Sequence, residues 1–254
     1  MNEVSRIRVG TSGWHYKHWI NRFYPAGLPP GKMLSWYADH FNTVEINNTF
    51  YRLPGKDALL QWRLAVPPDF LFSVKASRFI THMKRLRDPE SSIENFFSRI
   101  EALRPSLGPI LFQLPPRWRI NVARLEHFLE ALPKNAGYQY VLEFRDASWA
   151  APALYQLMQR HNVALCLHDW QGASWPEELT ADFAYLRFHG PTGNYSGKYP
   201  DSFLEKWAEK ISSWPILSCV WVYFNNDAAG HAVTNAQTMC KLLQQKGIVR
   251  ERAA

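Results

Sequence analysis

The chain has 254 residues, of which 46% are hydrophobic and 20% charged, and its formal net charge is +7. This composition is typical of an ordered globular protein and excludes a disordered or low-complexity chain. At about 100–200 residues per domain, the length allows one large domain or two small ones. The cysteines Cys166, Cys219 and Cys240 form no CxxC pair. We expect them to be reduced core thiols, which predicts a cytoplasmic protein.

No segment approaches the roughly 18 uncharged apolar residues that a membrane-spanning helix needs, so we expect no membrane partner. The N-terminal sequence MNEVSRIRVG lacks the apolar core of a signal peptide. The positive net charge has two interpretations. It can serve only to keep the protein soluble, or it can attract an anionic partner such as a phosphate ester or a nucleic acid. No block of five or more Lys and Arg residues accompanies this charge.

Strand-like and helix-like segments alternate along the chain. Eight runs rich in β-branched and aromatic residues predict strands, at 7–13, 43–50, 70–77, 109–114, 138–146, 163–169, 183–190 and 218–227. Apolar residues at helical spacing predict seven helices, at 32–41, 57–66, 93–103, 122–132, 153–161, 203–213 and 232–245. The segment QGASWPEEL at 171–179, which follows the sixth strand, favours no regular helix.

Strands that are separated by helices pair in parallel through right-handed crossovers. Eight such units in about 250 residues predict an α/β fold, a closed (β/α)₈ TIM barrel. We expect a single domain over residues 1–254, with a core of about 7–247 and an irregular or missing helix after the sixth strand. An open doubly wound sheet is the alternative, but the first turn, GTSGW, lacks the GxGxxG pattern.

Side chains alternate between the two faces of a strand, so each strand predicts which residues share a face. Leu142 and Phe144, for example, oppose Glu143 and Arg145. The apolar face must pack on the helices, so the polar face points into the barrel, near the end where barrel active sites lie. In the second strand this face also includes Thr49. The predicted polar lining comprises Glu45, Asn47, Lys75, Gln113, Glu143, Arg145, His168, Arg187, His189, Tyr223 and Asn225.

Seven motifs in these segments resemble a known family. They are GTSGW (10–14), FNTVEINNTFY (41–51), FSVKAS (72–77), LFQLPP (111–116), EFRDASW (143–149), LRFHG (186–190) and YFNND (223–227). Together they resemble the YecE-like family, domain of unknown function number 72, over nearly the whole chain. The resemblance implies a (β/α)₈ barrel and no established reaction.

Five inward residues are candidates for acid–base catalysis. Glu45 and Glu143 face each other across the predicted barrel and can divide acid and base roles. Lys75, if it is desolvated beside a cation, has a lowered pKa and can act as a base or a Schiff-base amine. His168 and His189 titrate near neutral pH. The alternative is a buried ion-pair network in which the arginines are paired to the glutamates and only fix the register.

Arginine side chains suit planar, bidentate recognition of carboxylate or phosphate, so we expect an anionic small molecule as substrate. The candidate substrate-binding residues are Asn47, Gln113, Arg145, Asp146, Trp149, Arg187, Tyr223 and Asn225. A divalent metal is a further alternative, because the right ligand types occur at Glu45, Glu143, His168, Asp169, His189 and Asp227. No HxH, HExxH or DxD spacing supports it, and the metal ligands stay unassigned.

The leading hypothesis is a TIM-barrel acid–base enzyme, a hydrolase, lyase or isomerase, that acts on a phosphate- or carboxylate-bearing substrate at the carboxyl-terminal mouth of the barrel. The alternative is a nucleic-acid-binding protein with a basic, aromatic rim, formed by Arg117, Trp118, Arg119, Lys198 and Tyr199. The glycine-rich loop HGPTGNYSGKYP at 189–200 predicts a mobile lid.

Overall fold

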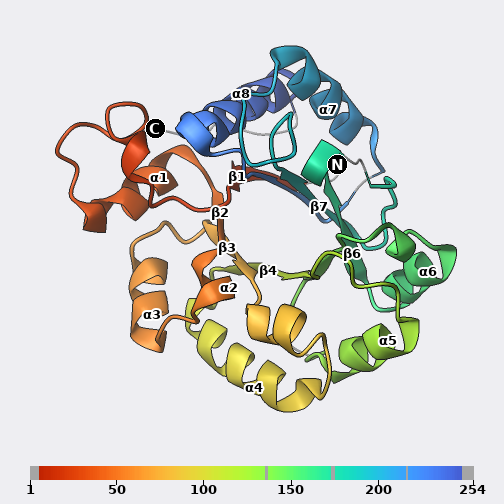
Figure 1. The fold of residues 1–254 in the computed structure, drawn as a ribbon. Coiled ribbons are helices and arrows are strands. Elements are labelled where there is room, and N and C mark those ends of the chain that lie inside the picture. The colour runs from red at the N-terminus through yellow and green to blue at the C-terminus, as the bar shows by residue number, and fades with distance from the viewer. Residues whose placement is uncertain (1–5, 135–136, 173–174, 216, 248–254) are drawn as a thin grey trace.

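The computed structural model describes residues 6–134, 137–172, 175–215 and 217–247. Eight parallel strands surround one axis, and helices pack around the outside of the strands (Figure 1). This arrangement confirms the predicted single-domain (β/α)₈ barrel. The ends of the predicted domain, 1–5 and 248–254, lie outside the described residues. None of the described helices is long and apolar enough to cross a membrane.

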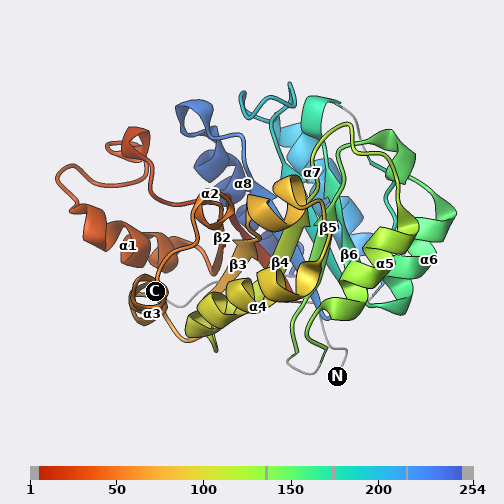
Figure 2. The same ribbon diagram turned by 60° about the horizontal axis from the view of Figure 1, so that its bottom comes forward.

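The described elements follow the predicted order. The strands are β1 (Arg6–Thr11), β2 (Thr43–Ile46), β3 (Leu71–Lys75), β4 (Leu107–Gln113), β5 (Tyr140–Glu143), β6 (Val163–His168), β7 (Phe183–Phe188) and β8 (Cys219–Phe224). The helices are α1 (Met33–His40), α2 (Asn48–Tyr51), α3 (Lys56–Leu64), α4 (Pro89–Ile100), α5 (Val122–Ala131), α6 (Pro152–Arg160), α7 (Asp201–Ser213) and α8 (His231–Gln245). Figure 2 shows the helices beside the strands, turned from the view of Figure 1.

Two segments differ from the prediction in a way that affects the mouth of the barrel. The second strand ends at Ile46, and Asn48–Tyr51 form the short helix α2. Thr49 was wrongly predicted to continue the inward face; its hydroxyl instead donates to the backbone oxygens of Ile46 (3.0 Å) and Lys75 (2.6 Å). Such local bonds compete with a strand ladder. A π-helical turn, Phe79–Met83, that the sequence did not predict follows β3.

Several other strands end earlier than predicted. β5 ends at Glu143, β7 at Phe188 and β8 at Phe224. Arg145, His189 and Asn225 therefore lie on loops just beyond the strands. After β6 the chain forms only a short helical turn, Trp170–Gly172. The expected irregular helix there is confirmed as far as the chain is described, since 173–174 lie outside the described residues.

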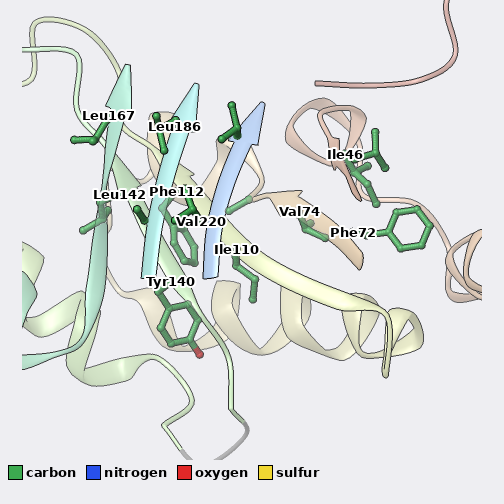
Figure 3. Packing of buried hydrophobic residues seen from close by; sticks show 14 of the residues in the cluster. Ile46, Phe72, Val74, Ile110, Phe112, Tyr140, Leu142, Leu167, Leu186 and Val220 are labelled. Atoms are coloured by element: carbon green, nitrogen blue, oxygen red, sulfur yellow. The ribbon is translucent and has the colours of Figure 1, made fainter. Parts of the chain in front are cut away.

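The core has two layers, one on each side of the strands. Outward-facing side chains such as Phe112 and Leu186 pack between the strands and the helices (Figure 3). A second apolar cluster fills the inside of the barrel, formed by Leu111, Val141, Ala164, Cys166, Phe183, Tyr185, Cys219, Trp221 and Tyr223. Val141 and Tyr185 each lie two residues before a charged residue of the same strand. The apolar cluster therefore forms a floor beneath the polar mouth.

The barrel closes between β1 and β2, which stand at the two ends of the hydrogen-bonded strand order. A Cβ atom at Gly10 would lie 2.2 Å from the carbonyl oxygen of Thr43, so only glycine permits this approach. The hydroxyl of Tyr37, on α1, bridges the two strands. It accepts from the Thr11 N–H (2.9 Å) and donates to the Thr43 oxygen (3.2 Å).

Replacing Tyr37 by phenylalanine is expected to leave two buried backbone groups without this partner, at a cost of about 1–3 kcal/mol in the free energy of unfolding. The melting temperature should fall by about 2–4 °C for each kcal/mol. Tyr155→Phe is the matched control, because the buried hydroxyl of Tyr155 has no hydrogen-bond partner among the described residues. Equal melting temperatures for the two variants, measured by circular dichroism, would contradict the bridging role.

Candidate functional site

A buried guanidinium joins three strands inside the barrel. Arg187, on β7, donates to both carboxylate oxygens of Glu45, from Nε at 2.9 Å and from Nη2 at 2.8 Å. Its Nη1 donates to Oε2 of Glu143 at 2.5 Å. All three residues are fully buried. Paired charges of this kind form short, directional hydrogen bonds, and here they tie β2, β5 and β7 together.

A second arginine completes the cluster. Nε of Arg145 donates to Oε1 of Glu143 at 2.5 Å, and its Nη2 forms an ion pair with the same oxygen. The guanidinium also lies over the ring of Trp170, 4.2 Å from the ring centroid. The structure thus brings together the two predicted arginines and the two predicted glutamates, and their charges balance. This is the pairing that the ion-pair alternative describes.

The arginines keep both carboxyl groups ionised. Burial alone would raise the pKa of Glu45, but Arg187 lowers it below the ordinary value. Burial alone would also raise the pKa of Glu143, but Arg145 and Arg187 hold this pKa well below the ordinary value. Neither glutamate is therefore a proton donor near neutral pH. Their role in this geometry is to hold the arginines.

His189, on the loop after β7, contacts both arginines. Its Nε2 accepts from Nη2 of Arg145 (3.1 Å) and from Nη1 of Arg187 (3.2 Å), which assigns the ring proton to Nδ1. Nδ1 lies 3.5 Å from Oδ1 of Asp169. The same oxygen accepts the backbone N–H of His189 at 2.7 Å. Burial lowers the pKa of His189, so the ring is neutral near neutral pH.

Both ring nitrogens of His168 are engaged with the backbone. Nε2 donates to the carbonyl oxygen of Phe144 at 2.8 Å, and Nδ1 accepts the N–H of Trp170 at 3.3 Å. Burial lowers the pKa of His168 to about 4. This geometry positions Trp170 over Arg145 and leaves neither nitrogen of His168 open to a substrate.

Lys75, the last residue of β3, differs from the other charged residues. Its Nζ lies 4.4 Å from the centroid of the Phe50 ring, and within the described chain this ammonium group has no carboxylate partner. Burial and then the charge of Arg187 lower its pKa from 10.5 to about 8. The residue is only half-buried. It is therefore a titratable group that a bound molecule can reach.

His82 was missed by the sequence analysis. Its ring packs on the edge of Phe50 at a centroid distance of 4.9 Å, in the π-helical turn after β3. Burial and the charge of Lys75 lower its pKa to about 4. The sequence offered one indication of His82, namely its position between a strand and the following helix, where barrel enzymes carry site residues.

The structure separates three other predicted residues from this cluster. Tyr223 lies in the floor, where its hydroxyl bonds Oγ1 of Thr43 at 2.7 Å. Asp146 accepts from the N–H (3.0 Å) and the hydroxyl (2.6 Å) of Ser148 and so caps a turn. Trp149 is buried against Phe144, the residue that follows β5, and its Nε1 donates to the carbonyl oxygen of Trp118 at 2.6 Å.

Polar atoms without partners gather at the carboxyl ends of the strands. Five such buried atoms of the described chain lie there: Oγ of Ser12, Oδ1 of Asn47, Oε1 of Gln113, Nδ1 of His189 and Oδ1 of Asn226, while those of Tyr155 and Trp221 lie elsewhere. They follow or end β1, β2, β4, β7 and β8. Buried polar groups in proteins nearly always have a partner, so this set is a feature of a site that binds polar molecules. Asn225 lies half-buried beside them.

The metal alternative finds no support in the arrangement of the described side chains. No group of three or more His, Cys, Asp and Glu residues is placed there to hold a metal ion. The oxygens of Glu45 and Glu143 are occupied by arginine. Asp227 accepts from Nε1 of Trp19 at 2.7 Å and pairs with His18.

The predicted aromatic rim is only partly open. Trp118 and Tyr199 are buried, and the hydroxyl of Tyr199 bonds Asp169 and accepts the Gly190 N–H at 2.5 Å. This last bond joins the two ends of the loop 189–200, whose mobility as a lid stays a prediction. The large apolar side chains that the structure exposes around the mouth come from other positions, Tyr51, Phe79, Met83 and Tyr195.

Replacing Glu143 by glutamine is expected to remove the charge that holds Arg145 and Arg187. Breaking a buried ion pair costs about 3–5 kcal/mol, so the melting temperature should fall by roughly 10 °C at neutral pH. Glu94→Gln, at an exposed position of α4, is the control. Because the folded pKa of Glu143 is depressed, the difference is complete above about pH 4.3 and shrinks as the pH falls below it. If Glu143→Gln had the same melting temperature as wild type at pH 7, the result would contradict the role of Glu143 in holding the arginines.

Replacing Lys75 by methionine is expected to stabilise the protein at neutral pH. The folded pKa of about 8 lies below the ordinary 10.5. Folding therefore disfavours the protonated amine below pH 8, and this cost disappears as the pH rises toward 10.5. The gain should be about 1–2 kcal/mol at pH 7, since Lys75 is partly exposed, and should vanish near pH 10.5. Lys206→Met, on the exposed face of α7, is the control; a destabilised Lys75→Met variant at pH 7 would show that the cation is structural.

The comparisons with known proteins agree with the fold. The chain matches the family described as "Protein of unknown function DUF72" over residues 8–254. The UPF0759 protein YunF of Bacillus subtilis (strain 168) is 29% identical over 273 residues, which cover 93% of this chain and 94% of YunF. The UPF0759 protein YecE of Escherichia coli (strain K12) is 34% identical over 136 residues. That match spans about half of each protein, 52% of this chain and 46% of YecE.

A solved structure gives the same result. The crystal structure of a DUF72 family protein from Thermotoga maritima MSB8 superposes with a TM-score of 0.85 at 30% sequence identity, covering 94% of this chain and 99% of that chain. The resemblance found in the sequence motifs is thereby confirmed. The family match extends over the whole described barrel, and the chain belongs to the DUF72 family.

Proposed function

We propose that this protein is an acid–base enzyme that acts on a phosphate- or carboxylate-bearing substrate at the mouth of the barrel, with Lys75 as the proton-transfer group. The observation that carries the proposal is the unpaired ammonium of Lys75 beside a charge-balanced cluster. Its pKa of about 8 allows it to hold or release a proton near neutral pH. Acid–base catalysis works best with such a pKa. Hydrolysis, elimination and isomerisation all use this step.

The other titratable groups support this choice by exclusion. His168 uses both nitrogens on the backbone. A proton on Nε2 of His189 would face the guanidinium groups of Arg145 and Arg187, which opposes its charging. Among the candidates that the sequence analysis named as catalytic, Lys75 therefore fits proton transfer best.

The charge of the mouth favours an anionic substrate. Lys75 adds a positive charge to a cluster that is otherwise balanced, and Nη1 of Arg145 forms no hydrogen bond within the described chain. An ammonium and an adjacent guanidinium edge suit phosphate or carboxylate oxygens. Asn47 and Gln113 add amide groups with unpartnered oxygens at the same end of the barrel.

Two replacements of Lys75 separate anion binding from proton transfer. Arginine keeps the positive charge but does not release its proton, whereas methionine loses both. We expect inorganic phosphate to raise the melting temperature of wild type and of Lys75→Arg, and to have little effect on Lys75→Met. Lys206→Met should respond like wild type. An equal phosphate response of Lys75→Met and wild type would contradict an anion site at this residue.

Turnover provides the second half of this test. With phosphomonoesters and carboxylic acids as substrates, kcat/KM should change with a pKa near 8, and Lys75→Arg should lose turnover by at least about 100-fold, the scale of general acid–base catalysis. A substrate that Lys75→Arg converts at the wild-type rate would show that Lys75 only binds the anion.

A cytoplasmic setting is part of the proposal. The thiols of Cys166, Cys219 and Cys240 are free, and the first two are buried. Proteins of oxidising compartments rarely retain three unpaired cysteines, so the free thiols support a reducing environment.

A nucleic-acid-binding role is the second candidate, and the exposed aromatic residues favour it. Tyr51 and Phe79 are exposed at the mouth beside basic residues of the segment 78–87, which contains Arg78, Lys84, Arg85 and Arg87. Bases stack on such rings while cations contact the phosphates. Fluorescence anisotropy with a single-stranded oligonucleotide should then show binding that weakens steeply between 50 and 200 mM salt. Absence of binding at low salt would remove this candidate.

A further inference from the structure

A cavity of about 710 Å³ opens next to the mouth, between the loop after β1, the start of α1 and the helix α3. We call it the aromatic groove. The side chains that give it its character are Trp14, Tyr16, Asn47, Asn48, Gln61 and Trp62. Its volume lies in the range of sites that enclose a small organic ligand.

The aromatic walls of the groove are held in place by the loop after β1. The rings of Trp14 and Trp62 meet edge to face at a centroid distance of 5.1 Å. The hydroxyl of Tyr16 donates to the carbonyl oxygen of Ser12 at 2.7 Å, and the hydroxyl of Tyr24 donates to that of Trp14. Gly13 permits this turn, since its φ is +111° and a Cβ atom there would lie 2.6 Å from the Tyr16 hydroxyl.

The polar side chains that line the groove are three amides, the imidazole of His15 and the hydroxyl of Tyr16. Of the residues that the structure describes, no Asp, Glu, Lys or Arg lines it. Nδ2 of Asn47 donates to the Ser12 oxygen at 3.3 Å, whereas the buried Oδ1 has no hydrogen-bond partner in the described parts of the chain. Asn48 and Gln61 are exposed and carry further amide groups. Aromatic walls with an open amide acceptor suit a neutral ring that carries an N–H or O–H donor.

The groove adjoins the proposed anion site at Asn47. In the ladder between β2 and β3, Ile46 pairs with Val74, so the next residues, Asn47 and Lys75, lie side by side. Neighbouring strands are about 4.8 Å apart. The bond from Thr49 to the Lys75 carbonyl (2.6 Å) keeps the two segments together beyond the ladder. Asn47, which lines the groove, is therefore the neighbour of Lys75, which lies just outside the lining.

We propose that the aromatic groove is a subsite for the neutral ring of the substrate, a nucleoside or a sugar ring, whose phosphate or carboxylate meets Lys75. The placement of the anionic group rests on the proposed function, while binding of the ring does not. Asn47 Oδ1 accepts a hydrogen bond from an amine or hydroxyl of the ring, and the paired rings of Trp14 and Trp62 form the wall on which the ring packs.

The test follows the indole N–H signals of Trp14 and Trp62 by two-dimensional NMR, assigned with Trp14→Phe and Trp62→Phe. The probes are adenosine 5′-monophosphate, adenosine, glucose 6-phosphate and inorganic phosphate. The expected result is that at least one ring-bearing probe shifts both signals and that inorganic phosphate shifts neither. Shifts with both adenosine probes identify a nucleoside ring, and shifts with glucose 6-phosphate alone identify a sugar. No shift with any ring at millimolar concentration would overturn the proposal.

Variants then test the named contacts. Asn47→Leu keeps the approximate size of the side chain and should weaken binding of the effective probe about tenfold, and Gln61→Ala should weaken it less. Gln159→Ala, at an exposed position of α6, is the matched control and should bind like wild type. Wild-type affinity in Asn47→Leu would contradict the role of the amide acceptor.

Lys75→Met separates the two proposals. It should reduce affinity for the phosphorylated probe while the tryptophan signals still shift with the ring. Unchanged affinity in Lys75→Met would contradict the proposed anion site and leave the ring subsite standing. A phosphate response that depends on Lys75, without tryptophan shifts for any ring, would overturn the ring subsite alone.

Discussion

The ion pair between Arg187 and two glutamates is the interaction on which the upper half of the barrel depends. A guanidinium that is withdrawn from water loses its hydration, and only well-placed carboxylates offset that loss. Glu45 and Glu143 do so from β2 and β5, with Arg187 on β7 between them. The contacts reach across the barrel, so they fix where these strands stand relative to one another. A slip of one residue in any of these strands would turn a charge onto the apolar outer face.

The remaining groups of the cluster take their positions from this interaction. The other carboxylate oxygen of Glu143, Oε1, forms an ion pair with Arg145. Both arginines contact Nε2 of His189. The ring of Trp170 covers Arg145, and the backbone N–H of Trp170 is held by His168. The two interpretations of the sequence, a structural network and a reactive site, are thus compatible. The network uses the arginines and glutamates, and Lys75 stays outside it with a proton that it can exchange.

The sequence predicted the barrel and the inward charged residues because both depend on local patterns. Alternation of strands and helices indicates the fold, and alternation along each strand places Glu143 and Arg145 on the inner side. The pairing of Arg187 with Glu45 joins residues that are 142 positions apart. No local pattern shows which of the opposite charges meet. The balance of charges, and hence the unpaired state of Lys75, therefore required the structure.

The errors arose where strands end. Thr49 follows a strand that stops at Ile46, because the chain turns into α2. Asp146 and Trp149 follow the strand of Glu143, where Asp146 caps a turn and Trp149 packs on Phe144; their predicted binding role stays a prediction. His82 belongs to a π-helical turn that has no periodic signature in the sequence. Strand ends are set by the neighbouring strand and by side-chain bonds to the backbone, which a single sequence does not display.

The most direct test of this account is the titration of the Lys75 amine in the folded protein. Trace acetylation across pH 6–11, followed residue by residue by mass spectrometry, reports the fraction of each lysine that is deprotonated. We predict a midpoint near pH 8 for Lys75, below the ordinary lysine value of about 10.4. A midpoint for Lys75 at or above about 10.4, the ordinary lysine value, would show that its ammonium is paired or fully solvated. It would contradict the assignment of proton transfer to this residue.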